Sequence, residues 1–394
     1  MKLFAIGLCA LTLIAAAPAS AAPAKWIGSW TAPPQPPGPA SKAFSNQTIR
    51  QVVRLSAGGE RIRIRLTNEY GQKPLVVGAA TVALAGADGK PSGAVVPVTF
   101  GGQAGATIPT GAPLLSDPVE LKVGDLSGLS ISLYLPGETG PCSCHGTGLQ
   151  TAFISQPGDF TKADFQAKET FTSRAFLSAV EVETPRPAKT VVVIGDSISD
   201  GFRSTLDANR RWPDRLAERL REAHPKEAWG VANLGISGNR VLSNGAGESV
   251  LTRFDRDLSI PGAAYLIVFE GVNDVGQGSR PNGGGIPSAE AMIAGYKQII
   301  ERGHAKGLKV IGATIAPYEG AAYYTADGDA VRQQINDWIR TSKAFDGIID
   351  FDAVWRDPAN PKRIKADLQP GDWLHGNDAG YKAFGEAVDL KLFR

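Results

Sequence analysis

The stretch TVVVIGDSISDG, residues 190–201, decides the fold of the C-terminal half of the chain. Its apolar run from Thr190 to Ile194 predicts a buried strand, because short β-branched runs of this kind suit a sheet that is covered on both faces. The residues that follow, Gly195 to Ser197, predict a sharp turn into a helix. We therefore expect Ser197 to project from a strand-to-helix turn, near backbone N–H groups that point at a reacting group.

Downstream of this stretch, apolar strands alternate with amphipathic helices. Further strands are expected near 231–234, 264–269, 309–315 and 347–351, and helices near 211–223, 248–258, 288–305, 329–343 and after Asn377. Five β/α units in series predict a parallel sheet with helices on both faces. Sheets of this kind bind ligands at the carboxyl ends of their strands, so reactive residue types at those ends mark the candidate site.

The residues before 184 show a different hydrophobic pattern. Alternating or Val-rich runs at 61–66, 75–84 and 129–135 are separated by glycine turns at 57–59, 88–89 and 101–102. This spacing predicts an all-β, jelly-roll-like sandwich at residues 25–184. The segment 184–189 contains two prolines and is expected to be a stiff linker to the α/β domain at 190–394.

The N-terminus predicts export. Lys2 precedes an apolar run at 3–17, and the small residues at 19–21 form a cleavage pattern, so residues 1–21 are interpreted as a signal peptide. The apolar run is short for a membrane span, which needs about 20 residues. We expect a secreted or periplasmic protein with no stable membrane insertion.

Length and charge bound the remaining possibilities. The chain has 394 residues, 43% of them hydrophobic and 20% charged, which is enough material for two cores. With 41 basic and 39 acidic residues, its net charge of +2 predicts no nucleic-acid partner and no polybasic membrane patch. The oligomeric state is not set by the sequence.

Reactive residue types do gather at the expected strand ends. Ser197 follows the first strand, Gly238 the second and Asn273 the third, while Asp372 and His375 follow the fifth. A serine hydroxyl needs a base to become nucleophilic, and His375 is the candidate base, with Asp372 orienting its ring. The N–H groups of Ser197 and Gly238 and the side-chain amide of Asn273 are expected to form an oxyanion hole, in which losing one donor costs about 2.7–4 kcal/mol.

Each of these residues also has a simpler interpretation. Ser197 alone could be a helix N-cap and Asn273 alone an Asx-turn residue, but their placement together with an Asp/His pair favours catalysis. Asp196 and Asp274 are expected to orient the loops, and Asp200 could do either.

The stretch Cys142-Ser143-Cys144-His145 leaves its chemistry open. A strained disulfide and two free thiols are both compatible with the spacing, and the spacing is not that of a zinc motif. The sequence does not tell how far His145 lies from the site. No metal and no cofactor is expected.

The blocks around Ser197, Gly238, Asn273 and His375 resemble those of the SGNH hydrolases, also called the GDSL esterase and lipase superfamily. The resemblance spans 190–394. It implies a flavodoxin-like, three-layer α/β/α fold with strand order 2-1-3-4-5 and a Ser-His-Asp acyl-enzyme mechanism. The upstream half is similar to secreted members that carry a β-sandwich before the hydrolase domain.

Three functions compete at this point. The first is an esterase that removes small acyl groups, acetyl foremost, from a polysaccharide or glycoside. The second is a lipase, lysophospholipase or arylesterase. The third is a non-catalytic binding protein for carbohydrate, phosphate or flavin, which would leave the Asp372/His375 pair unexplained. Four tryptophans could stack on sugars, although a core role is commoner for this residue; they are Trp30, Trp212, Trp229 and Trp355.

Overall fold

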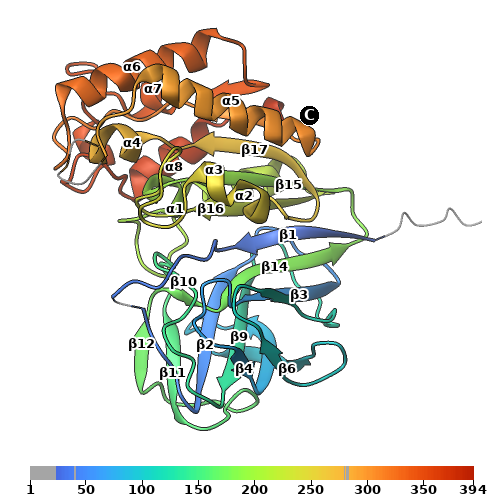
Figure 1. The fold of residues 1–394 in the computed structure, drawn as a ribbon. Coiled ribbons are helices and arrows are strands. Elements are labelled where there is room, and N and C mark those ends of the chain that lie inside the picture. Colours follow the sequence, from blue (N-terminus) through green and yellow to red (C-terminus); the bar gives the residue numbers. More distant parts are fainter. Residues whose placement is uncertain (1–23, 40, 279, 281–283) are drawn as a thin grey trace, which may run out of the picture.

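The computed structural model describes residues 24–39, 41–278, 280 and 284–394. The expected signal peptide at 1–21 lies outside these residues. Figure 1 shows a β-sandwich built from the first half of the chain, with a parallel α/β layer stacked on it. The fold class expected from the sequence is therefore confirmed.

The sandwich consists of antiparallel strands. Its larger sheet has the order β12-β11-β2-β9-β5-β6 and its smaller one β1-β14-β3-β8, with two short pairs, β10-β13 and β4-β7. The bounds are β1 (Lys25–Thr31), β2 (Gln47–Arg54), β3 (Arg61–Thr67), β4 (Leu75–Val77), β5 (Ala79–Ala85), β6 (Pro91–Val98), β7 (Ala106–Ile108), β8 (Pro113–Leu115), β9 (Gly128–Leu135), β10 (Cys144–His145), β11 (Ala152–Pro157), β12 (Glu169–Phe171), β13 (Arg174–Ala175) and β14 (Leu177–Thr184).

Strand β3 shows why the sequence forms this sandwich. Ile62, Ile64 and Leu66 face the core and are fully buried, while the arginines between them face outward. Arg61 and Arg63 pair across the sheet with Glu183 and Glu181 of β14. The alternation thus satisfies both faces of the strand, apolar side chains inside and cross-strand ion pairs outside.

The Val-rich run at 75–84 does not form one continuous strand. The run at 75–84 is divided between β4 and β5, which belong to different sheets. The division falls at Gly78, whose N–H donates to the Tyr134 carbonyl at 2.9 Å. A Cβ at this position would lie 2.9 Å from the ring of Tyr134, so only glycine lets the chain change sheets here.

The second layer is a five-stranded parallel sheet. Its strands are β15 (Ala188–Gly195), β16 (Ala228–Gly235), β17 (Ala263–Phe269), β18 (Lys309–Ala313) and β19 (Gly347–Ile349). Their order is β16-β15-β17-β18-β19, which confirms the expected 2-1-3-4-5. The turn that follows β15 lies between the carboxyl ends of the neighbouring strands β16 and β17. Gly195, the last residue of β15, pairs with Gly235 of β16 and with Phe269 of β17.

Helices cover both faces of this sheet. They are α1 (Ser197–Asp200), α2 (Trp212–Ala223), α3 (Val250–Asp257), α4 (Val272–Gln277), α5 (Ala289–Ala305), α6 (Ala326–Thr341), α7 (Phe351–Trp355) and α8 (Asp378–Ala387), with short 3₁₀ turns at Ala366–Leu368 and Leu390–Phe393. Right-handed crossovers place α2 on one face and α3, α5 and α6 on the other, because the chain reverses direction across the sheet after β16. Helix α8 packs beside α2.

The bounds of several elements differ from those expected, and the strand expected at 309–315 ends at Ala313. The helix expected from 329 begins at Ala326, since the hydroxyl of Thr325 caps it by accepting the Gly328 N–H. The strand expected to reach 351 ends at Ile349, and Phe351 opens α7. Asn273, expected just after the third strand, lies inside the short helix α4.

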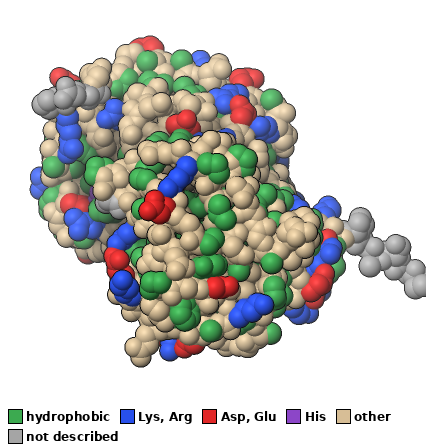
Figure 2. Space-filling model, turned by 60° about the horizontal axis from the view of Figure 1, so that its bottom comes forward, with side chains coloured by type: hydrophobic (Ala, Val, Ile, Leu, Met, Phe, Trp, Pro, Cys, Tyr) green, Lys and Arg blue, Asp and Glu red, His purple; other side chains and the backbone are tan. Residues whose placement is uncertain are grey.

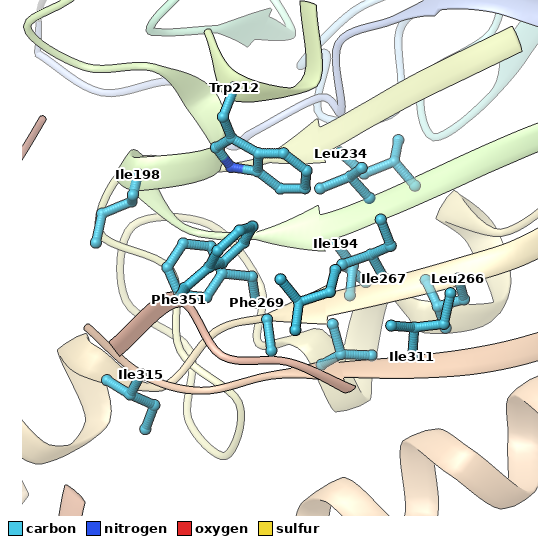
Figure 3. Close-up of a cluster of buried hydrophobic side chains, with 14 of the residues drawn as sticks. Ile194, Ile198, Trp212, Leu234, Leu266, Ile267, Phe269, Ile311, Ile315 and Phe351 are labelled. Atoms are coloured by element: carbon cyan, nitrogen blue, oxygen red, sulfur yellow. The ribbon is translucent and has the colours of Figure 1, made fainter. Parts of the chain in front are cut away.

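Aromatic side chains fill the core between the sheet and α2 (Figure 3). Trp212 lies edge-on to Phe351, with ring centroids 5.2 Å apart, and Phe351 is 4.8 Å from Phe269. Trp212 and Trp355 are fully buried and Trp229 is 4% exposed. These three tryptophans therefore serve the core, and sugar stacking by them is ruled out by burial.

The two layers meet where β1 lies beside the edge strand β16 (Figure 1). The Gly28 N–H donates to the Pro261 carbonyl at 2.9 Å, and the Val231 N–H to the Ser56 hydroxyl at 2.8 Å. A Cβ on Gly230 would lie 2.1 Å from the carbonyl oxygen of Gly28. The close approach of the layers therefore depends on glycine at this contact.

The face seen in Figure 2 carries Lys and Arg side chains interspersed with Asp and Glu, and no single-sign field covers it. Within the described part of the chain, none of the helices is both long enough and apolar enough to cross a bilayer.

Candidate active site

Ser197 lies at the first helical position after β15, as its sequence context predicts. The carboxylate of Asp196 caps α1 by accepting the Ile198 N–H at 2.8 Å. Gly195 permits the turn, because a Cβ there would lie 2.5 Å from the Phe269 carbonyl oxygen. The side chain of Ser197 is thus held at the carboxyl edge of the sheet, where it is 5% exposed.

His375 reaches this serine from the other end of the domain. Its Nε2 lies 2.9 Å from the Ser197 Oγ, and its Nδ1 lies 2.9 Å from Oδ2 of Asp372. Because a carboxylate can only accept at Nδ1, the neutral ring carries its proton there, and the Nε2 lone pair faces the hydroxyl. The structure therefore brings the expected Ser, His and Asp together in one hydrogen-bonded chain.

Asp372 is held as a carboxylate by the turn that contains it. Oδ1 accepts the backbone N–H groups of Leu374 and His375 at 3.1 and 3.0 Å. Burial raises the pKa of Asp372, but the hydrogen bonds from the ring and backbone of His375 outweigh it, so the pKa lies well below the usual range. Trp373 takes the left-handed conformation that closes this turn, at φ +58°.

Two side chains missed by the sequence analysis flank the histidine. Phe202 contacts the His375 ring edge-on, with centroids 4.8 Å apart. The Arg203 Nε lies 3.5 Å from the Asp372 Oδ2. Both follow Ser197 closely in sequence, so their proximity to the nucleophile was the available signal. Phe202 shields one side of the base, while Arg203 adds positive charge beside the carboxylate.

Gly238 and Asn273 lie on the segments that follow β16 and β17, the two strands that pair with β15. Gly238 has a φ of +82°, which favours glycine, and the loop that carries it follows the β16 end next to Ser197. The Asn273 Nδ2 donates to the carbonyl of Asn239 at 3.0 Å, which ties α4 to this loop. A side-chain amide has two N–H bonds, so one remains for a substrate oxygen.

The orientation of the Asn273 amide is set by two donors that the sequence analysis missed. Its Oδ1 accepts from the Gln277 Nε2 at 2.7 Å and from the Tyr323 hydroxyl at 3.1 Å. With the oxygen engaged in this way, the Nδ2 end is turned toward the Gly238 loop. Gln277 lies one helical turn after Asn273, whereas nothing in the sequence pointed to Tyr323.

The two aspartates expected to orient loops do so. Asp274 accepts the N–H groups of Val241 and Leu242 at 2.8 and 3.1 Å, which fixes the chain after Gly238. Burial raises the pKa of Asp274 to about 6, against the two N–H bonds that lower it. Asp196 caps α1 as described above.

Glu270, which was not predicted, forms a buried acidic cluster with these two aspartates beneath the site. Burial, followed by the charges of Asp196 and Asp274, raises the pKa of Glu270 well above its usual value. Burial also raises the pKa of Asp196. Adjacent buried carboxylates repel each other, so each favours the protonated form of its neighbours. The position of Glu270 at a strand end, one residue before Gly271, was its only signal.

The disulfide left open by the sequence is present between Cys142 and Cys144. The next residue, His145, reaches the α/β domain, where its Nε2 lies 2.8 Å from the Asp200 Oδ1. No group of three or more His, Cys, Asp or Glu side chains suited to a metal ion occurs among the described residues.

Comparisons with known proteins match one family model and several solved structures. The model of the GDSL-like Lipase/Acylhydrolase family matches residues 193–383. Among solved structures, a GDSL-like lipase from Bacteroides thetaiotaomicron is 18% identical, with 52% of this chain and 88% of that one covered and a TM-score of 0.40. An acetylxylan esterase from Geobacillus stearothermophilus is 19% identical, with 51% and 93% covered and a TM-score of 0.40. Among the curated proteins, none matches the sequence.

The fold and the family match define the class of the protein, a carboxylic ester hydrolase of the SGNH type. The residues matched by the GDSL-like lipase and acylhydrolase model lie within its α/β half.

Proposed function

We propose that the protein is an exported serine esterase that removes short acyl groups, acetyl foremost, from a carbohydrate, with Ser197, His375 and Asp372 as its catalytic residues. The observation that carries this proposal is the hydrogen-bonded chain from the Ser197 Oγ through His375 to Asp372, with contacts of 2.9 Å on both sides of the ring.

The reaction proceeds through an acyl-enzyme. His375 takes the proton of Ser197 as the Oγ attacks the ester carbonyl, and the N–H groups of Ser197 and Gly238 and the Asn273 amide stabilise the oxyanion. His375 then gives the proton to the departing alcohol. In the second half a water attacks the acyl-enzyme, again with His375 as base, which releases the acid and restores the serine.

A short acyl group suits the surroundings of the nucleophile. Ser197 is 5% exposed and His375 9%, so access to the reacting atoms is narrow. Large exposed apolar side chains are few in the described residues, and of these only Phe202 and Leu206 lie within ten residues of Ser197 in the sequence. A long acyl chain would need a wider apolar surface to leave water.

The buried disulfide between Cys142 and Cys144 supports export, since disulfides persist in oxidising compartments. N-terminal sequencing of the mature protein tests whether the signal peptide at 1–21 is removed. A chain that starts at Met1 or Lys2 would contradict the proposed processing at 1–21.

The substrate is tested with a series of p-nitrophenyl esters of increasing chain length, run beside acetate release from acetylated xylan and pectin. We expect the highest kcat/KM for the acetyl ester and acetate release from at least one polymer. A maximum at long acyl chains would instead identify a lipase. A high rate on aryl acetates with no release from any polymer would identify an arylesterase.

A further inference from the structure

His145, a residue of the sandwich, forms a buried contact with the catalytic half of the protein. Its Nε2 lies 2.8 Å from the Oδ1 of Asp200, the last residue of α1, and its Nδ1 lies 3.1 Å from the carbonyl oxygen of Pro33. His145 is 5% exposed and Asp200 3%. A buried pair of this kind persists only if its hydrogen bonds are complete.

The partners of His145 determine where its protons lie. The Pro33 carbonyl can only accept, so Nδ1 carries a proton. The Asp200 Oδ2 is already engaged by the N–H and the hydroxyl of Ser237, at 3.0 and 2.8 Å. The contact between Nε2 and Oδ1 is therefore a separate hydrogen bond between His145 and Asp200.

Asp200 also connects His145 to the loop that carries Gly238, the expected oxyanion donor. Ser237 directly precedes Gly238, and its hydroxyl also lies 2.8 Å from that of Thr147, two residues after His145. A chain of hydrogen bonds thus runs from His145 of the sandwich through Asp200 and Ser237 of the α/β domain. It ends at Thr147, which again belongs to the sandwich. This chain fixes the loop from which the Gly238 N–H projects.

The contact also bears on the nucleophile. Asp200 lies three residues after Ser197 in the single turn of α1, and the guanidinium of Arg211 holds this turn through the Asp200 carbonyl at 2.9 Å and the Gly148 carbonyl at 2.6 Å. A shift of Asp200 would therefore displace the nucleophile and the oxyanion donor together. A displacement of about 1 Å is enough to slow a reaction of this type by about 100-fold.

We infer that His145 is a positioning residue of the esterase: through Asp200 and Ser237 it sets the Gly238 N–H in the oxyanion hole, so that the sandwich supplies part of the catalytic apparatus. This inference rests on the proposed catalytic function of Ser197 and Gly238. Its physical basis is that an oxyanion donor stabilises the transition state only when it is preorganised at the position that the oxyanion will occupy.

The test compares His145→Ala and His145→Gln in the full chain, with p-nitrophenyl acetate as substrate. We expect His145→Ala to lower kcat about 10- to 100-fold with KM changed less than about threefold, because the lost interaction matters mainly in the transition state. The amide of His145→Gln can still donate to Asp200 and should restore kcat to within about threefold of the wild type.

A matched control is His304→Ala. His304 also forms a His–Asp contact of 2.8 Å, with Asp346, but it is exposed and lies at the far end of α5. This variant should retain the wild-type kcat. Thr147→Val and Ser237→Ala, which remove single members of the chain, should each lower kcat about three- to tenfold, and they carry the test if the His145 variants do not fold.

A folded His145→Ala protein with the wild-type kcat would overturn the inference, as would a change confined to KM or an equal loss in His145→Ala and His145→Gln. These outcomes are distinct from failure of the proposed function itself. That failure would show as a wild-type protein without esterase activity, or as full activity in Ser197→Ala.

Discussion

The Nε2 of His375 lies 2.9 Å from the Ser197 Oγ, although 178 residues of chain separate the two. Helix α8, which follows His375, secures this contact, because the hydroxyl of Tyr381 in α8 donates to the Phe202 carbonyl at 2.6 Å. Phe202 in turn packs on the His375 ring. The serine and its base are thus joined through the elements around them as well as directly.

Ser197→Ala should abolish esterase activity. Without the hydroxyl no acyl-enzyme forms, and we expect kcat on p-nitrophenyl acetate to fall by about 10⁵-fold or more, with an unchanged circular dichroism spectrum. A fluorophosphonate probe should label Ser197 in the wild type and nothing in the variant. Ser342→Ala, at the end of α6, should keep both labelling and activity. Labelling at another residue, with full activity in Ser197→Ala, would overturn the assignment.

Asn273→Ala should lower kcat by about 10²- to 10³-fold and change KM much less, since the amide bonds most strongly to the charged oxygen of the transition state. Tyr323→Phe removes one of the two donors that orient this amide and should lower kcat only about three- to tenfold. Tyr134→Phe, whose hydroxyl contacts Asn46 on the exposed part of the sandwich, serves as the control. Steady-state kinetics measure kcat and KM for each variant. A change in KM alone for Asn273→Ala would exclude an oxyanion role for Asn273.

Glu270→Gln should flatten the pH dependence of stability. Burial and two neighbouring carboxylates raise the pKa of Glu270, so the folded protein keeps a proton that the unfolded chain releases above about pH 4.3. The stabilisation is complete below that pH and is lost as the pH rises toward the folded pKa, at about 1.4 kcal/mol per pH unit for one proton.

Thermal unfolding measured between about pH 5 and 8 tests the role of Glu270. The wild type should lose stability relative to Glu270→Gln as the pH rises, and the exposed control Glu386→Gln should behave like the wild type. Parallel curves for the wild type and Glu270→Gln would show that Glu270 holds no proton of its own.

The parts of the fold that local pattern determines could be predicted from the sequence. Each strand of the parallel sheet is a short apolar run, and the alternation of these runs with helices predicts a parallel sheet, whereas the strand order is implied only by the family resemblance. The residues placed at the strand ends, Ser197, Gly238 and Asn273, could be located for the same reason. Pattern failed at 75–84, where a tertiary contact between Gly78 and the Tyr134 ring divides one apolar run between two sheets.

The residues that orient the site could not be predicted, because their partners are distant in sequence. Tyr323 contacts Asn273 from 50 residues away and His145 contacts Asp200 from 55 residues away. Tyr323 lies in no motif and at no expected strand end, and the stretch that contains His145 leaves the distance of His145 from the site open. Such contacts depend on how loops fold over the sheet edge and on how the sandwich docks, and neither is encoded in a local periodicity.

Gly230→Ala should loosen the docking of the two layers. The added Cβ would lie 2.1 Å from the Gly28 carbonyl oxygen, and overpacking of this kind costs about 1–3 kcal/mol. We expect a lower midpoint of thermal unfolding together with a lower kcat on p-nitrophenyl acetate. Gly124→Ala, where a Cβ meets nothing within 4 Å, is the matched control and should change neither. A destabilised Gly230→Ala protein with the wild-type kcat would show that docking and catalysis are independent.

The last prediction concerns a chain that begins near Arg186 and so lacks the sandwich. Such a chain loses two hydrogen bonds of β16 with the sandwich, one that the Val231 N–H donates to Ser56 and one that the Thr31 hydroxyl donates to the Asn233 carbonyl, at 2.8 Å each. It exposes Ala228, which packs in the sandwich core. It also loses His145 and its contact with Asp200. We therefore expect even p-nitrophenyl acetate to be hydrolysed at least about tenfold more slowly, as for other displacements of an oxyanion donor. Calorimetry of the full chain should accordingly show a single unfolding transition, since the layers share buried contacts. If the truncated chain folds and turns over this ester at the normal rate, the sandwich only binds substrate, and its proposed part in catalysis is wrong.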